Sequence, residues 1–215
     1  MFWLVLLFIA GDQMNDNNTV LILPEPDTIG KITVEQALLH RRSVRSFSAE
    51  PLTLEDISQL LWAAQGKTGK TYGRTAPSAG ATYPMEVFLV AGNVSGIDAG
   101  IYQYLIEIHG IKLIRHGNFS KELANAALGQ NFISTAPAVI VLTCEYRRTT
   151  GRYGERGIRY VHMEAGHIGE NISLECVARQ LGTVMVGAFL DSAIQRILST
   201  KYEPLYIIPV GHIKK

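Results

Sequence analysis

The sequence has few cysteines and no arrangement of them that builds a structural centre. Its two cysteines, Cys144 and Cys176, lie far apart, each within an apolar stretch. Cys-x-x-Cys pairs, zinc-ligand spacings and a disulfide framework are absent, so we predict two buried thiols and favour a reducing compartment. The six histidines are dispersed as well; His162 and His167 miss the i, i+4 spacing of a helical zinc pair. A metal site is not expected.

The chain also has little excess charge of either sign. Its formal net charge is +1, and 18% of its residues are charged, with both signs mixed along the sequence. We identify no basic stripe interleaved with aromatic residues, a pattern typical of nucleic-acid-binding proteins. A function in binding nucleic acid or acidic lipid through a general electrostatic field is therefore not predicted.

The N-terminal hydrophobic run is short. Residues 2–10 are almost wholly apolar, whereas about 20 such residues are needed to span a bilayer. A signal peptide is not predicted either, because no Lys or Arg precedes the run and no Ala-x-Ala site follows it. The run docks on the protein or on a partner subunit, or translation starts at Met14; the sequence is compatible with both. We expect a cytoplasmic protein, and the alternative interpretation of the run is an anchor to a membrane or a complex.

Beyond this N-terminal segment (residues 1–20), the sequence predicts one α+β domain over residues 21–215. The chain is 47% hydrophobic and contains no repeat, linker or low-complexity tract. Thr33 and Gln36 form a capping-box pattern before a helix that begins at Val34, and Thr53 caps a second helix that ends at Gly66. Further helices are predicted over residues 121–128 and 158–181, and strands over residues 87–91, 101–105, 111–114, 138–144, 183–186 and 205–210.

The first candidate site is basic. Arg41, Arg42 and Arg45 surround Ser43 just past the first helix. Cations at this position favour the helix dipole and commonly stay solvated. They also suit a phosphate clamp, since guanidinium groups bind phosphate oxygens bidentately and a serine hydroxyl adds a donor. Spacing alone leaves both interpretations open.

Two further segments are candidates for contact with a flat ligand. Pro77, Ser78, Ala79 and Gly80 form a turn of small residues that lets backbone approach a ring closely, although an ordinary loop has the same composition. Gly187 and Ala188 follow a predicted strand, and their backbone amides are placed to meet an anionic or electron-rich atom. Each pattern is weak by itself.

Taken together, the three segments resemble the nitroreductase family. Arg41–Phe47, Arg74–Gly80 and Val186–Phe189 occur in the order and spacing of that family, most similar to its branch of SagB-type dehydrogenases, which includes the azoline oxidases of peptide natural-product synthesis. The similarity covers about residues 21–212.

The resemblance implies a mixed, mainly antiparallel sheet flanked by helices, in an intertwined homodimer with FMN sites at the interface. Residues 158–181 would form much of that interface, with Ile168 and Ile172 beside the small residues Gly166 and Gly169. The implied cofactor-binding residues are Arg41, Arg42, Ser43 and Arg45 for the phosphate and ribityl chain, Pro77, Ser78, Ala79 and Gly80 for the isoalloxazine ring from the partner subunit, and Gly187 and Ala188 near flavin N5.

The activity implied is ping-pong hydride transfer through FMN, with NAD(P)H or an organic substrate as donor and a small molecule as acceptor. No residue is assigned as a catalytic acid or base. Relatives often extend past the equivalent of His212 with an arm that holds the phosphate, a role that Lys214 or Lys215 takes only if the tail folds back. Lys201-Tyr202 does not align with the Lys-Tyr pair of some azoline oxidases, so azoline oxidation is not predicted. The alternative is a non-catalytic flavin-binding protein for storage or partner recognition.

Overall fold

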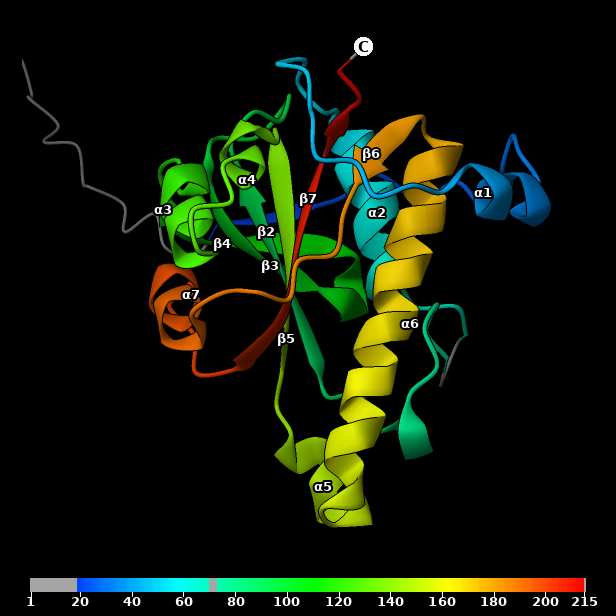
Figure 1. The fold of residues 1–215 in the computed structure, drawn as a ribbon. Helices are drawn as coiled ribbons and strands as arrows, with labels where there is room; N and C mark the ends of the chain where they lie inside the picture. Colours follow the sequence, from blue (N-terminus) through cyan, green and yellow to red (C-terminus); the bar gives the residue numbers. More distant parts are fainter. Residues whose placement is uncertain (1–18, 70–72, 215) are drawn as a thin grey trace, which may run out of the picture.

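A seven-stranded sheet with helices on both faces forms the centre of the computed structural model, which describes residues 19–69 and 73–214 (Figure 1). The strand order is β1-β4-β3-β2-β5-β7-β6, and every ladder is antiparallel. The strands are β1 Val20–Ile22, β2 Met85–Ala91, β3 Gly100–Leu105, β4 Gly110–His116, β5 Ala138–Cys144, β6 Leu181–Thr183 and β7 Glu203–His212. The predicted α+β fold is confirmed. The apolar residues 2–10 lie outside the described part of the chain.

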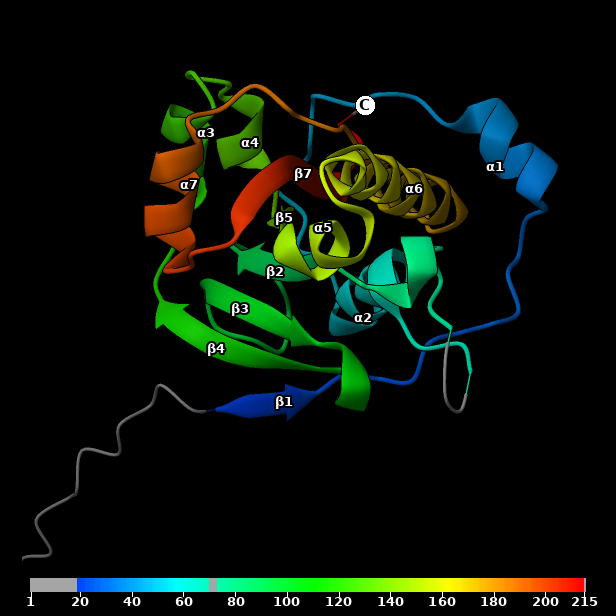
Figure 2. The ribbon, with the colours of Figure 1, turned by 90° about the horizontal axis from the view of Figure 1, so that it is seen from below.

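The helices divide between the two faces of the sheet (Figure 2). On one face lie α2 Leu54–Gln65 and α6 Arg156–Ala178; on the other lie α3 Ser120–Ala126, α4 Phe132–Thr135 and α7 Asp191–Leu198. Two shorter helices pack on α6, namely α1 Val34–His40 and α5 Arg147–Tyr153, and 3-10 turns occupy η1 Ala79–Ala81 and η2 Ile106–Ile108. None of the helices in residues 19–69 and 73–214 has the length and hydropathy of a bilayer-spanning segment.

The position of strand β5 in the sheet explains why its sequence is apolar without interruption. All seven residues are buried, because helices cover both faces of the sheet at this point. Ile140 and Leu142 pack toward α2 and α6, while Val139 and Val141 pack into the core beneath α3 and α7. The run predicted from residues 138–144 thus forms the central strand.

Helix α2 begins at its predicted cap and is tied there to the end of α6. Thr53 and Asp56 form a reciprocal capping box, and Arg179 Nε donates to Asp56 Oδ1 at 2.7 Å. Burial raises the pKa of Asp56, but the hydrogen bonds from Thr53 and Arg179 outweigh it and leave that pKa lowered. The predicted capping box of Thr33 and Gln36 is confirmed in the same way.

Two boundaries near the end of α6 differ from the prediction. The helix ends at Ala178, and Gln180 adopts a left-handed conformation (φ 59°) that turns the chain sharply into β6. The strand expected at residues 183–186 is therefore wrong: the ladder covers Leu181–Thr183, and only Val186 pairs again, in an isolated bridge to Ile207. Tertiary pairing with β7 decides this register.

The residues on the buried and outward faces of α6 also differ from those predicted. Ile168 and Ile172 are fully buried in the core of their own chain, so they do not form an intersubunit surface. A Cβ atom at Gly169 would lie 3.0 Å from Sδ of Met185 in the same chain, whereas a Cβ atom at Gly166 would meet nothing within 4 Å. Of the two glycines, Gly166 faces outward.

Both cysteines are free and buried. Cys144 ends β5, and Cys176 lies in the last turns of α6. Burial raises the pKa of Cys144 to about 12 and raises that of Cys176 as well. Both thiols are therefore protonated at neutral pH.

Candidate active site

The arginine segment, residues 41–45, leaves α1 and runs along the edge strand β6. Val44 N donates to Thr183 O at 2.9 Å, and Ser43 forms a parallel bridge with Thr183. This approach requires Gly182, because a Cβ atom there would lie only 2.7 Å from Cγ1 of Val44. A cavity of about 330 Å³ adjoins the segment, and its lining includes Arg42 and Val44 of the segment together with residues of α6 and β6.

The three arginines of this segment are used differently. Arg42 Nη1 donates to the carbonyls of Leu39 (2.9 Å) and Arg41 (2.7 Å), so this guanidinium closes the end of α1. Arg41 Nε lies 3.9 Å from Oε1 of Glu170 on α6, an exposed pair at the limit of contact. Ser43 and Arg45 are exposed. Arg41, Ser43 and Arg45 thus remain accessible to an anion.

The C-terminal tail returns to this segment. Ile213 bridges Phe47, and Lys214 N donates to Ser46 O at 3.1 Å. The backbone of Lys214 therefore lies directly beside the arginine segment, as a supplementary phosphate ligand would require. Lys215 is outside the described residues.

The small-residue turn, residues 77–83, is held in a strained backbone conformation. Gly80, Ala81 and Tyr83 all have positive φ values, of 59°, 53° and 44°. Glycine suits the positive φ at residue 80, where a Cβ atom would also lie 2.5 Å from the hydroxyl of Tyr153 and force that side chain to shift. Ser78 Oγ accepts a hydrogen bond from Tyr83 N at 2.9 Å, so this hydroxyl already serves the turn itself.

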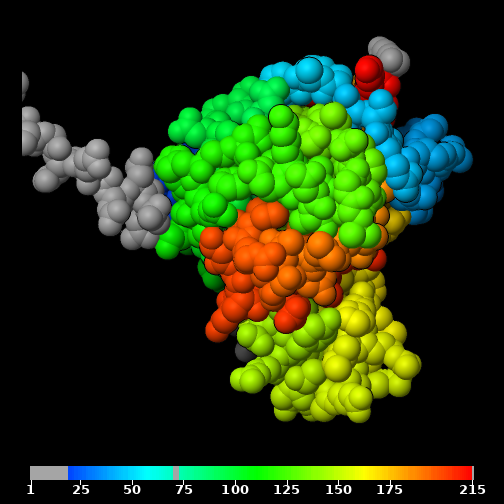
Figure 3. Space-filling view, turned by 60° about the vertical axis from the view of Figure 1, so that its left-hand side comes forward, coloured from blue at the N-terminus to red at the C-terminus, as the bar shows by residue number. Residues whose placement is uncertain are grey.

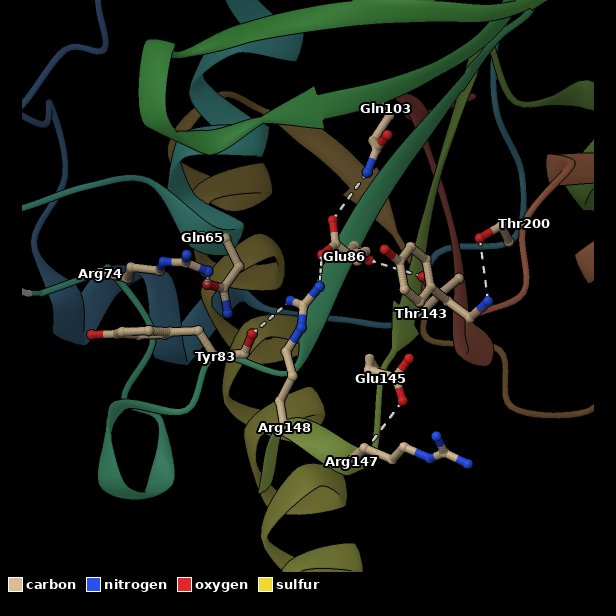
Figure 4. A network of polar contacts seen from close by, with 11 residues as sticks. Gln65, Arg74, Tyr83, Glu86, Gln103, Thr143, Glu145, Arg147, Arg148 and Thr200 are labelled. Atoms are coloured by element: carbon tan, nitrogen blue, oxygen red, sulfur yellow. Dashed lines mark hydrogen bonds and ion pairs between the residues drawn. The ribbon is translucent and has the colours of Figure 1, made fainter. Parts of the chain in front are cut away.

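A buried polar chain supports the turn from below. Arg74 Nη1 donates to Gln65 Oε1 (2.9 Å), and Gln65 Nε2 donates to Glu164 Oε1 (3.3 Å), with Gln65 and Glu164 both buried. The guanidinium of Arg74 lies 4.1 Å from the ring centre of Tyr83, as the close-up shows (Figure 4). Burial raises the pKa of Glu164, while hydrogen bonds from Ser78 and Gln65 and the charge of Arg74 oppose this rise.

A second set of contacts ties the turn to α5. Arg148 donates to Tyr83 O at 3.0 Å and pairs with Glu86, which also accepts from Gln103 Nε2 at 3.0 Å (Figure 4). None of Gln65, Glu164, Arg148 or Glu86 was singled out from the sequence. Gln65 and Glu164 lie on largely buried helix faces and Glu86 lies on a largely apolar strand, but such a pattern does not reveal the partner of a polar residue.

The third candidate segment offers backbone donors. Gly187 and Ala188 are exposed after the bridge at Val186, and Ala188 O accepts from Gln130 Nε2 at 3.1 Å. Within the described residues, neither the N–H of Gly187 nor that of Ala188 donates to a protein acceptor. Two exposed amides in succession can receive an anionic or electron-rich ligand atom.

Within the described residues, no hydrogen bond or ion pair joins the arginine segment to the turn. The arginine segment lies beside Glu170, whereas the turn contacts Arg152, Tyr153 and, through Ser78, Glu164. From Glu164 to Glu170 the helix rises about 9 Å. Candidate residues Arg41, Ser43 and Arg45 therefore lie nearer the C-terminal end of α6 than Pro77, Ser78, Ala79 and Gly80.

Comparison with known proteins gives a consistent result. The model of the nitroreductase family matches residues 38–212. A protein of Methanocaldococcus jannaschii described as a candidate nitroreductase is 47% identical over 186 residues, which are 86% of this chain and 93% of that protein.

Two solved structures share the architecture. A nitroreductase-like protein of Ralstonia eutropha superposes with a TM-score of 0.79 at 28% identity, over 91% of this chain and 90% of that chain. A chain of the Escherichia coli microcin synthetase complex, solved with truncated pro-microcin bound, gives a TM-score of 0.70 at 21% identity, over all of this chain and 85% of that one. The second likeness concerns the fold alone.

Proposed function

The chain belongs to the nitroreductase family, and on that premise we propose that it is an FMN-dependent oxidoreductase that moves hydride between NAD(P)H or an organic substrate and a small-molecule acceptor. The observation that carries this proposal is the pair of exposed, unused amides at Gly187 and Ala188. An isoalloxazine ring has a hydrogen-bond acceptor at N5 that such amides suit.

The residues present fit the remaining parts of FMN. Arg41 and Arg45 supply exposed guanidinium groups for the phosphate, Ser43 adds a hydroxyl, and the tail at Lys214 runs alongside. Arg42 serves mainly to position them, because its donors already bind the end of α1. At the ring, Pro77, Ala79 and Gly80 present small side chains and backbone, while Ser78 is engaged within the turn.

A homodimer would complete this site. If two copies pack with their α6 helices antiparallel about a two-fold axis, the arginine end of one copy meets the turn of the other. The outward face of α6 carries Gly166, Met163 (50% exposed) and Ile158 (40% exposed), which permits close helix contact. This arrangement would bring together two segments that no hydrogen bond or ion pair joins within the described part of one chain.

The chemistry divides between cofactor and protein. FMN, when bound, supplies the hydride acceptor and donor. The amides of Gly187 and Ala188 orient the reactive edge of the ring, and the arginine segment fixes the phosphate. The strained turn, stiffened by Arg74 and Arg148, keeps the ring's surroundings in one geometry. No side chain is assigned to proton transfer.

The experiment is to purify the protein, record its visible spectrum and identify the released cofactor by mass. We expect FMN after mild denaturation; FAD, or no flavin after reconstitution, would contradict the proposal. Addition of NAD(P)H should bleach the yellow protein, and an acceptor should restore the colour. A protein that holds FMN but does not bleach would instead be a non-catalytic flavin-binding protein.

A further inference from the structure

In the basic hairpin formed by α5 and the start of α6, the proposed function uses only Arg148, which holds the turn, and Ile158, on the outward face of α6. Residues 145–160 contain five arginines, two glutamates and no lysine, a net charge of +3 in a chain whose total is +1. Tyr146, Tyr153 and Tyr160 alternate with the arginines. The expectation that no basic stretch is interleaved with aromatic residues is therefore wrong for this hairpin, which projects as a yellow-green lobe in the space-filling view (Figure 3).

Most of these guanidinium groups lack a carboxylate partner among the described residues. Among the described residues, only Arg148 of the five lies within 4 Å of one, that of Glu86. The side chain of Arg147 points away from the neighbouring polar network (Figure 4). The guanidinium of Arg156 lies 5.9 Å from the ring centre of Tyr160, and Arg159 is exposed. Within the described part of the chain, four of the five guanidinium groups therefore have no carboxylate partner.

The hairpin lies directly beside the turn assigned to the flavin ring. Arg152 Nη1 donates to Gly80 O at 3.1 Å, and the hydroxyl of Tyr153 occupies the space that a side chain at residue 80 would fill. The rings of Tyr153 and Tyr160 pack edge to face, with centroids 5.2 Å apart. Cations and aromatic rings are thus placed next to the point where a hydride donor would approach.

We propose that this hairpin binds the 2′-phosphate of NADPH and makes the protein selective for NADPH over NADH. The inference rests on the proposed function and specifies its electron donor. The two dinucleotides differ by one dianionic group, and arginine matches phosphate geometry with two parallel hydrogen bonds. Tyrosine rings suit the adjoining adenine by stacking. Among the described residues, Arg147, Arg156 and Arg159 have no carboxylate and no backbone acceptor; of these, Arg156 and Arg159 lie one turn apart on α6 and are the principal ligands.

Binding tests the site independently of catalysis. Calorimetry on the flavin-loaded protein should show that 2′,5′-ADP binds at least tenfold more tightly than 5′-AMP. Arg156→Ala with Arg159→Ala should weaken 2′,5′-ADP about tenfold or more and change 5′-AMP less than twofold. Arg196→Ala, an exposed arginine on α7, is the matched control and should change neither. Equal affinities, or equal losses for both ligands, would overturn the proposal.

Kinetics and assembly complete the test. The ratio of kcat/KM for NADPH over NADH should exceed ten and fall toward one in the double variant, with the dimer intact in sedimentation. Loss of the dimer would show that the hairpin is an intersubunit contact, and displacement of 2′,5′-ADP by polyglutamate but not by NADPH would assign it to an acidic polypeptide. Either result overturns the inference. Absence of flavin would count against the proposed function, whereas flavin bleached equally by both dinucleotides would count against this inference alone.

Discussion

The arginine segment and the small-residue turn both lie along α6, but they are held differently. Few side-chain contacts hold the segment, whereas many fix the turn. The arginine segment rests on β6 through the hydrogen bond from Val44, and Arg45 is exposed. The turn has three left-handed residues and a buried polar chain beneath it. We infer that changes in the arginine segment alter ligand affinity with little effect on folding, whereas changes at the turn alter stability.

The largest effect should come from preventing the proposed dimer contact, which would bring the arginine segment of one copy to the turn of the other. Gly166→Phe places a ring on the outward face of α6, where a Cβ atom meets nothing in its own chain, so the monomer should fold but the helix contact should not form. We expect loss of dimer and FMN together, measured by sedimentation and by absorbance. Gly151→Phe adds the same ring at an open glycine of α5 and should retain both. A monomeric variant with full FMN affinity would show that the site is not shared between subunits.

Changes in the arginine segment should affect the affinity for FMN specifically. Arg41→Ala or Arg45→Ala is expected to weaken FMN by about 1.5–3 kcal/mol, the range for a hydrogen bond to a charged group. Fluorescence titration should show little change for riboflavin, which lacks the phosphate. The midpoint of urea unfolding in the absence of flavin should stay unchanged, because both side chains are at least partly exposed. Matching losses for FMN and riboflavin would mean that the arginines support the fold instead.

The packing of the arginine segment on β6 can be disturbed without changing an arginine. Gly182→Ala puts a Cβ atom 2.7 Å from Cγ1 of Val44 and 3.0 Å from Cγ1 of Ile213, so it should destabilise by about 1–3 kcal/mol and weaken FMN as well. Gly151→Ala, in open space within α5, should instead stabilise by about 0.5–1 kcal/mol. Urea unfolding measures both. A neutral Gly182→Ala would show that the segment shifts freely on β6.

The smallest effect concerns the ionisation of Glu164 beneath the turn. Burial raises the pKa of this carboxyl above its ordinary 4.5, so the folded state favours the proton. Wild-type stability should therefore fall, relative to Glu164→Gln, as pH rises from 4.5 through the raised pKa, and stay level below 4.5. Unfolding measured from pH 4 to pH 8 tests this. A difference that does not vary with pH would mean that Arg74 fully compensates the buried charge.

Local signals in the sequence predicted the elements whose formation depends on local interactions. The caps at Thr33 and Thr53 and the strands predicted over residues 101–105 and 111–114 are present, because adjacent residues determine them. The end of α6 and the position of β6 were not predictable, since pairing with β7 sets both. At the candidate site, the arginine segment was visible as a cluster. The chain from Arg74 to Glu164 was not, because its members are 90 residues apart in sequence.

The two buried thiols can report on local unfolding of the protein. Only a thiolate reacts rapidly with disulfide reagents, and neither Cys144 nor Cys176 ionises or meets solvent in the folded state. The labelling rate at each cysteine should therefore measure how often its neighbourhood exposes it. Cys144 reports on the central strand, while Cys176 reports on the end of α6 that borders the arginine segment. If bound flavin orders this end of α6, the labelling rate should fall more at Cys176 than at Cys144.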